Sequence, residues 1–232
     1  KAQVAVNNHT VSSLAAAEAV LSRQQKEAGT LVMDIGAGTT NLIVIEDGEV
    51  QHVAVLPVGG INITNDLAIG LKTDLDIAEA VKLQHASLKP DSKQSVSVKV
   101  GNFTHSFDYE MISMITEARV EELLEYVAKE LHKIKRSGKL PGGVVIVGGS
   151  AKLPGLADFT RDKLQLPARI GKLQDVGGLV DTVEDTSWCT PVGLMLLDML
   201  LTPSNPVSSS KGGRYAEQMF GLADSLLKRF KR

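Results

Sequence analysis

Residues 30–41 read TLVMDIGAGTTN, and this stretch decides the fold of the chain. Its first six residues form a near-continuous apolar run, typical of a strand buried on both faces, and two glycines then turn the chain. Two further apolar segments, 41–46 and 49–57, flank Asp47-Gly48, the strongest short-range hairpin signal in the sequence. This order predicts an antiparallel meander rather than a strand followed by a helix.

The glycine turn after the first strand has the residue types of a phosphate site. Gly36 and Gly38 allow backbone N–H groups to approach a phosphate closely, and Thr39 and Thr40 add hydroxyl donors. Asp34 would repel a phosphate by itself, so its carboxylate suits a hydrated Mg²⁺ or an attacking water. The turn is not a P-loop or a dinucleotide fingerprint, because no Gly-Lys-Ser/Thr follows and the next segment is a strand. A plain turn without a ligand is the alternative.

A second glycine turn follows a second buried strand at 144–147. In VGGSAKLPGL, residues 147–156, the glycines would let the backbone pass flat against a planar base, and the aliphatic stem of Lys152 would cover it. Alone, this turn also has a purely structural interpretation. The two turns together are more informative, because each ends a buried strand and they lie more than 100 residues apart.

The rest of the chain alternates helical and strand patterns, which predicts an α/β protein with a mixed sheet. A long amphipathic helix is expected at 109–137, with Met111, Met114 and Leu123 in the core. Cys189 is expected in a loop as a structural thiol, because no base is indicated beside it. The other expected elements are helices at 12–28, 61–71, 74–86, 155–164 and 191–201, a hairpin at 94–108 and a short strand at 168–170.

The composition excludes several classes of protein. The 232 residues are 43% apolar and 22% charged, which is ordinary globular usage. A net charge of −2 gives no general attraction to nucleic acid, so no nucleic-acid partner is expected. No stretch approaches the roughly 20 uninterrupted apolar residues of a membrane-spanning helix. The single cysteine cannot form an internal disulfide, which fits a reducing compartment.

The composition changes after Leu201. Residues 203–213 form a Pro/Ser/Gly-rich linker, and 214–232 carry apolar residues at helical spacing with five basic and two acidic side chains. A helix packed on its own domain or on a partner is the alternative, but the tether and the basic end favour reversible binding to an anionic membrane surface. The predicted membrane-facing residues are Tyr215, Met219, Phe220, Leu222, Leu226, Leu227 and Phe230, with Lys228, Arg229, Lys231 and Arg232 as the basic side chains.

Taken together, the motifs resemble the second half of the actin, heat-shock chaperone and sugar-kinase ATPase superfamily, which has a ribonuclease H-like fold. They are, in chain order, DIGAGTTNL (34–42), the Asp-Gly hairpin, AEAVK (78–82), VIVGGSAKLPGL (145–156) and TPVGLMLL (190–197).

The resemblance implies ATP with Mg²⁺ as the ligand, with Asp34 near the metal and the attacking water. On spacing alone, two of the implied ligands, Glu79 and Lys82, could equally form a surface ion pair, since they lie three residues apart on a helix. The implied contacts are Gly36, Gly38, Thr39 and Thr40 at the phosphates, Glu79 and Lys82 at the ribose and base, and Gly148, Gly149, Ser150 and Lys152 around the adenosine.

Within the superfamily, the chain most resembles the bacterial actin-like cell-division family FtsA. LPVGGINITNDLAIGL (56–71), ARIGKLQDVGGLVD (168–181) and the tail carry this resemblance. It implies a remnant of the first actin-like subdomain at 1–29, a nucleotide-binding subdomain IIA at 30–60 plus 140–202, an inserted smaller α+β subdomain IIB at 61–139, the linker at 203–213 and a membrane-targeting helix at 214–232.

The FtsA resemblance implies a protein that polymerises and tethers the tubulin-like protein FtsZ to the cytoplasmic face of the cell membrane at the division site, with other divisome proteins. Nothing before Thr30 resembles the superfamily's first phosphate loop, so we expect at most weak ATPase activity, and none from this fragment alone. A PilM-like scaffold for pilus or secretion assembly, an MreB-like cytoskeletal protein and a sugar-kinase relative remain alternatives, and the terminal helix favours FtsA over each.

Overall fold

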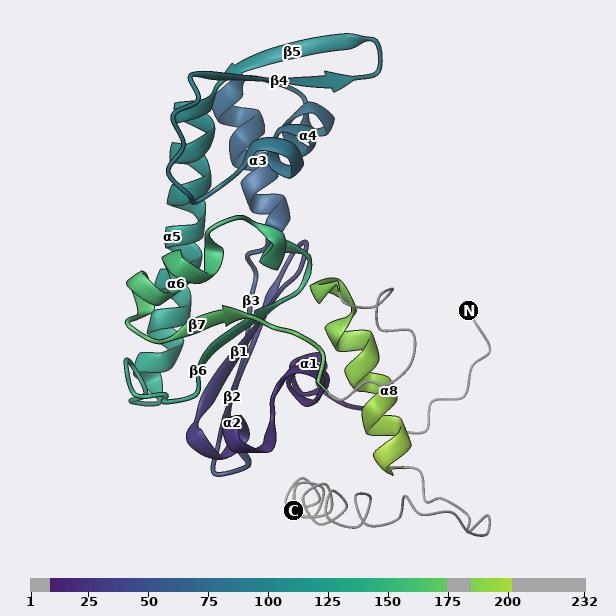
Figure 1. The fold of residues 1–232 in the computed structure, drawn as a ribbon, viewed down its shortest axis with the longest axis vertical. Coiled ribbons are helices and arrows are strands. Elements are labelled where there is room, and N and C mark those ends of the chain that lie inside the picture. Colours follow the sequence, from purple (N-terminus) through teal and green to yellow (C-terminus); the bar gives the residue numbers. More distant parts are fainter. Residues whose placement is uncertain (1–8, 175–184, 202–232) are drawn as a thin grey trace.

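The protein is built around a single five-stranded sheet. A computed structural model describes residues 9–174 and 185–201 (Figure 1). The strands β1 (Thr30–Ile35), β2 (Thr40–Glu46), β3 (Glu49–Leu56), β6 (Gly143–Val147) and β7 (Ala168–Ile170) lie in the order β3-β2-β1-β6-β7. The first three form the expected antiparallel meander, while β1–β6 and β6–β7 are parallel pairs. The mixed sheet of the α/β prediction is therefore confirmed.

The hairpin between β2 and β3 forms at Asp47-Gly48, as predicted. Both residues have positive φ, 54° and 71°, which is the geometry that Asp-Gly supplies in a two-residue turn. Both amides also donate outward, to the carbonyls of Glu27 and Lys26. The turn therefore joins two strands and also holds the helix before β1.

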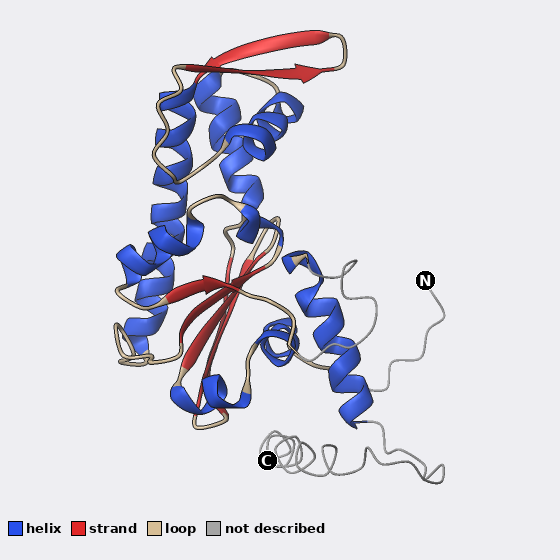
Figure 2. Ribbon diagram, in the orientation of Figure 1, coloured by secondary structure: helices blue, strands red, loops and turns tan. Residues whose placement is uncertain are grey.

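Helices cover both faces of the sheet, which explains why the central strands are apolar without alternation (Figure 2). On one face, Val32, Ile43 and Val145 pack with α1 (Ser12–Val20) and with Cys189 of α8 (Cys189–Leu201). On the other face, neighbouring residues of the same strands, such as Leu31 and Val144, pack with α5 (Tyr109–Lys133) and α6 (Leu156–Leu164). A strand between two such layers must be apolar at every position.

The contact between α1 and α8 depends on small residues. Ala15, Ala16 and Ala17 of α1 are fully buried, and Gly193 of α8 lies against them. A Cβ atom at Gly193 would lie 1.8 Å from the carbonyl oxygen of Ala15, so only glycine allows this approach.

A smaller group of elements stands above the sheet in Figure 1. It contains α3 (Gly60–Leu71), α4 (Leu75–His85) and the two-stranded hairpin of β4 (Ser95–Val100) and β5 (Phe103–Asp108). The long helix α5 runs from this group down to the sheet. The expected hairpin at 94–108 is thus confirmed.

The expected single helix at 12–28 is wrong, because the segment forms two helices. The chain leaves α1 at Leu21, which is extended, and α2 (Arg23–Ala28) begins after Ser22. Ser22 caps α2 through a reciprocal pair of hydrogen bonds with Gln25, at 3.3 and 3.1 Å. This local capping box outweighs the continuous helical propensity of the segment.

The core assignment in α5 is only partly correct. Leu123 is buried, but Met111 and Met114 are 39% and 62% exposed, because they lie on the side of the helix opposite its stripe of buried residues. The helix also ends earlier than the expected Ser137. Lys135 adopts a left-handed φ of 59°, and the amide of Arg136 bonds to the carbonyl of Leu131 at 2.9 Å, which closes the helix in a Schellman motif.

Two further sequence expectations concern the C-terminal part. Cys189 is the buried first residue of α8 rather than part of a loop. The predicted linker and membrane helix at 203–232 lie outside the described residues. Within 9–174 and 185–201, no helix combines the length and the apolar character that crossing a membrane requires.

Candidate functional site

The two glycine turns lie side by side at one edge of the sheet. They follow β1 and β6, which are parallel neighbours with Asp34 in register with Val147. Parallel strands place their carboxyl ends at the same edge, so the turns meet although they are far apart in sequence. The hydroxyl of Ser150 lies 3.5 Å from the carbonyl oxygen of Gly36, across 114 residues of chain.

Glycine is required where the turns touch. Gly148 has a φ of +90°, and a Cβ atom there would lie 2.5 Å from both Oδ1 of Asp34 and the carbonyl oxygen of Ile35. Gly59, just before α3, is equally restricted, because its Cβ would lie 2.6 Å from the carbonyl oxygen of Ala37. The first turn is therefore held by backbone from both β6 and α3.

Asp34 is half-buried at the end of β1. Its Oδ2 accepts a 2.8 Å hydrogen bond from the hydroxyl of Thr190, on the first turn of α8. A carboxylate held in this way and still partly open to solvent suits a hydrated Mg²⁺, which proteins commonly bind through one or two carboxylates plus substrate phosphates.

Some of the predicted phosphate-binding groups of the first turn are exposed, and others form hydrogen bonds within the protein. The amide of Gly36 bonds to the carbonyl of Thr39 at 2.9 Å, which closes the turn, and Gly38 and Thr39 are exposed. Thr40 is fully buried, and its hydroxyl donates to the carbonyl oxygen of Val58 at 2.8 Å. The exposed groups of this turn are therefore Gly38 and Thr39, whereas the Thr40 hydroxyl supports the loop before α3.

Glu79 and Lys82 lie on α4 and face the start of α3. They form an ion pair of 2.7 Å, and Oε2 of Glu79 also accepts a 2.5 Å hydrogen bond from the hydroxyl of Thr64. Lys82 further donates to the carbonyl oxygen of Gly60 at 3.1 Å. Burial raises the pKa of Glu79, but the hydrogen bonds from Lys82 and Thr64 outweigh burial, so that this pKa lies below its usual value.

The second turn continues from β6 into a short 3-10 helix, η1 (Gly149–Lys152). Gly149 is exposed, and Lys152 extends toward Asp185, with a 2.5 Å ion pair. This hydrogen bond from Lys152, together with those from Ser187, lowers the pKa of Asp185 to about 2. Thr186 lies beside them in η2 (Thr186–Trp188) and bonds to Gly148 through both its hydroxyl and its carbonyl, at 2.8 and 3.1 Å.

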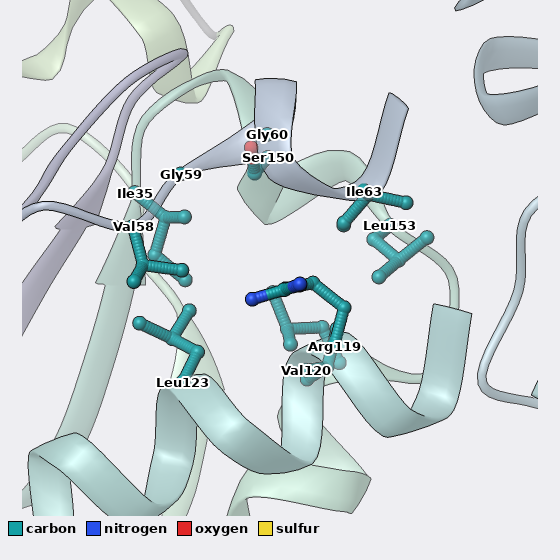
Figure 3. Close-up of a pocket in the computed structure, with 11 residues that line it drawn as sticks. Ile35, Val58, Gly59, Gly60, Ile63, Arg119, Val120, Leu123, Ser150 and Leu153 are labelled. Carbon is teal, nitrogen blue, oxygen red and sulfur yellow. The ribbon is translucent and has the colours of Figure 1, made fainter. Parts of the chain in front are cut away.

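Behind the two turns is a small apolar cavity of about 20 Å³ (Figure 3). Ile35, Val58 and Leu123 line one side, Ile63 and Leu153 the other, and the guanidinium of Arg119 points into it. This volume holds about one water molecule, so a nucleotide would lie on the open side of the turns and not here.

Cys189 lies close to this site without the properties of a nucleophile. Burial raises the pKa of its thiol to about 11, and the nearby Asp34 contributes to the increase. A thiol with this pKa is almost entirely protonated near neutral pH. The expectation of a structural cysteine is consistent with this environment.

Several residues of this region were not singled out in the sequence. Thr64 and Thr190 hold the carboxylates of Glu79 and Asp34, and Gly59 and Gly60 contact the first turn. The glycine pair and the threonine before Pro191 lie inside recognisable motifs, but Thr64 is an ordinary helix residue in sequence. Its role is visible only in the structure, where it lies opposite α4.

This arrangement of sheet, turns and helices is shared with solved structures of actin-like proteins. MreB5 of Spiroplasma citri, solved bound to ADP, matches with a TM-score of 0.66 at 20% identity, over 81% of this chain and 58% of that one. The MamK double helical filament matches with a TM-score of 0.61 at 18% identity, over the same shares. The chain therefore has the actin-like ATPase fold.

Sequence comparison identifies the family to which this chain belongs. The model of the family "Cell division protein FtsA" matches residues 31–193. Cell division protein FtsA of Bacillus subtilis is 36% identical over 200 residues, 84% of this chain and 44% of that protein. FtsA of Pseudomonas aeruginosa is 29% identical over 216 residues, 91% of this chain and 52% of that protein. The chain belongs to the FtsA family of cell division proteins, and it spans about half the length of these relatives.

Proposed function

We propose that this chain forms one wall of an ATP site in an actin-like cell division protein. The supporting observation is the contact between the two strand-end turns, where Ser150 reaches Gly36. In this proposal the first turn binds phosphates through Gly38 and Thr39, while the amide of Gly36, which was also predicted to contact phosphate, closes the turn. Glu79 of α4 faces the ribose, and the second turn lines the adenosine.

Asp34 would hold the Mg²⁺ that accompanies ATP. The metal, when bound, would neutralise phosphate charge and organise water. The chain itself keeps the carboxylate in place. The hydroxyl of Thr190 donates a hydrogen bond to Oδ2, and the backbone of Gly148 packs closely against Oδ1. Catalytic turnover by this chain is proposed to be weak at most.

Binding of nucleotide can be tested by adding charge to the first turn. Thr39→Glu places a carboxylate on the exposed part of the turn, and repulsion between two unit charges at 4 Å is worth about 4 kcal/mol at an intermediate dielectric. We expect at least a tenfold loss of ATP affinity, measured with Mg²⁺ by displacement of a fluorescent ATP analogue. Thr104→Glu, which adds the same charge on exposed β5, is the matched control. Equal affinity in the two variants would contradict the proposal.

We also propose that residues 214–232 bind the cytoplasmic face of the cell membrane. The support is the apolar stripe and the excess of basic residues, since apolar area and anionic lipid act together on such segments. Leu226→Asp with Phe230→Asp should abolish co-sedimentation with anionic vesicles. Gln218→Asp with Ser225→Asp changes the net charge equally outside the stripe and should retain most binding. Unchanged sedimentation of the first variant would refute membrane binding.

Membership of the FtsA family supports the wider role. We propose that the whole protein polymerises and tethers FtsZ, and with it other divisome proteins, to the membrane at the division site. In a reconstitution, FtsZ should join anionic vesicles only when this protein and its terminal segment are both present. FtsZ that sediments equally with the tail variant would contradict tethering through this segment.

A further inference from the structure

Four residues from α3 and α4 form a closed polar group beside the first turn. This Thr64 cluster consists of Gly60, Thr64, Glu79 and Lys82. Thr64 is at its centre and only 1% exposed, whereas the Glu79 side chain is 41% exposed. One member of the cluster is therefore open to a ligand, and the central member is not.

The hydrogen-bonding capacity of Lys82 is used up inside the cluster. An ammonium group has three N–H donors. Three oxygen atoms lie around Nζ: Oε2 of Glu79 at 2.7 Å, Oγ1 of Thr64 at 2.9 Å and the carbonyl oxygen of Gly60 at 3.1 Å. Lys82 consequently has no donor left for a nucleotide while this arrangement persists.

The single proton of the Thr64 hydroxyl has one preferred acceptor. Oγ1 lies 2.5 Å from Oε2 of Glu79 and 3.3 Å from the carbonyl oxygen of Gly60. The shorter, charge-assisted contact takes the proton, and Lys82 donates to the lone pairs of Oγ1. Both cluster contacts of Glu79 therefore end on Oε2, which leaves Oε1 to accept from a hydroxyl outside the cluster.

The cluster is also connected to the first turn. The amide of Gly60 donates to the carbonyl oxygen of Gly36 at 3.0 Å, and its own carbonyl accepts from Lys82. The next amide, that of Ile61, donates to the carbonyl oxygen of Ala37 at 2.8 Å. The position of the Glu79 carboxylate is thereby tied to the backbone that would bind phosphate.

We propose that Thr64 is a positioning residue that gives this wall its preference for ribose hydroxyls. Thr64 and Lys82 hold Oε2 of Glu79 so that Oε1 accepts a hydrogen bond from a ribose hydroxyl of the bound nucleotide. This inference rests on the proposed nucleotide site. It assigns ligand contact to Glu79 and an internal role to Lys82.

The test compares ATP with 2′,3′-dideoxy-ATP, which lacks both ribose hydroxyls, on the 232-residue chain with Mg²⁺. The unmodified chain should bind ATP about tenfold more tightly, as expected for one hydrogen bond to a carboxylate. Thr64→Val retains the shape but removes the hydroxyl, and the ratio of the two dissociation constants should fall below about twofold. Thr64→Ser should restore the ratio.

The outcomes separate the alternatives. Equal weakening of both nucleotides in Thr64→Val, with the ratio preserved, would mean a merely structural role and overturn the inference. A ratio near one in the unmodified chain would overturn it while leaving nucleotide binding intact. Binding of neither nucleotide would refute the proposed function, and the inference with it. If Thr64→Val does not fold, Glu79→Ala at the more exposed position replaces it, and a preserved ratio there also overturns the inference.

Discussion

The hydroxyl of Thr190 donates a 2.8 Å hydrogen bond to Oδ2 of Asp34, although 156 residues separate them along the chain. Asp34 is the second-to-last residue of the central strand, and Thr190 lies on the first turn of α8, which packs on one face of the sheet. The bond therefore fixes the start of α8 to the edge of the sheet where both glycine turns lie.

Removing this hydrogen bond should destabilise the fold. Thr190→Val keeps the shape of the side chain and leaves the partly buried carboxylate without its donor, which costs about 1–3 kcal/mol of unfolding free energy. Urea denaturation followed by circular dichroism measures the change. Thr190→Ser keeps the hydroxyl and should remain within about 1 kcal/mol of the unmodified chain. A Thr190→Val midpoint equal to that of the unmodified chain would show that the bond contributes nothing.

Gly148→Ala should be strongly destabilising. The backbone at this position has a φ of +90°, and the added Cβ would lie 2.5 Å from a backbone oxygen. With a ψ of 175°, this is an extended positive-φ conformation that essentially only glycine adopts; it costs another residue about 1–3 kcal/mol, and the close contact adds to this cost. Gly38→Ala is the matched control, because nothing lies within 4 Å of a Cβ there, and its effect should be below about 1 kcal/mol. Similar thermal shifts for the two variants would contradict the close packing of the turns.

The ion pair between Arg119 and Asp66 should couple α5 to α3. It is bidentate, with distances of 2.5 and 2.9 Å, and both side chains are largely buried, at 23% and 27% exposure. A double-mutant cycle with Arg119→Gln and Asp66→Asn should give a coupling energy of about 1–3 kcal/mol. The same cycle on the exposed pair Arg23–Glu27 should give less than about 0.5 kcal/mol. Equal coupling energies for the two pairs would show that the Arg119–Asp66 pair does not hold α5 and α3 together.

The pair of Lys152 and Asp185 predicts a pH dependence. Because the folded-state pKa of Asp185 is lowered from 3.8 to about 2, the charged carboxylate stabilises the fold above pH 4. This contribution is lost as the pH falls from about 4 to 2. Lys152→Met should return the pKa of Asp185 toward its ordinary value, which carboxyl NMR titration measures directly. A titration midpoint that does not move in this variant would show that Lys152 is not the cause.

Local sequence patterns were sufficient to predict most of the helices and strands. The runs that became β1 and β6 are apolar at nearly every position, and Asp47-Gly48 takes the left-handed pair of conformations that its residues favour. These predictions succeeded because each depends on residues adjacent in the chain. The break after Leu21 was also encoded locally, in Ser22 and Gln25, but the helical propensity around it obscured the signal.

The errors in α5 have another origin. Met111 and Met114 were assigned to the core because they are apolar on an amphipathic helix, but their spacing from the buried residues of α5 places them on its opposite side. The partners of the site carboxylates were missed for a different reason, because they come from other parts of the chain. A threonine has no distinctive pattern, and the role of Thr64 depends on a helix that begins 11 residues later.

By itself, the sequence determined the strands, the turns and the residue types at the candidate site, because conformational preference and hydrophobic periodicity act over a few neighbouring residues. Only the tertiary structure decided which groups remain free for a ligand. The parallel pairing of β1 with β6 brought the turns together, and the packing of α3 on α4 used the ammonium of Lys82 internally while leaving one oxygen of Glu79 open. Hydrogen-bonding capacity is shared among whatever groups the fold brings within about 3 Å, and that sharing is not encoded at any single position.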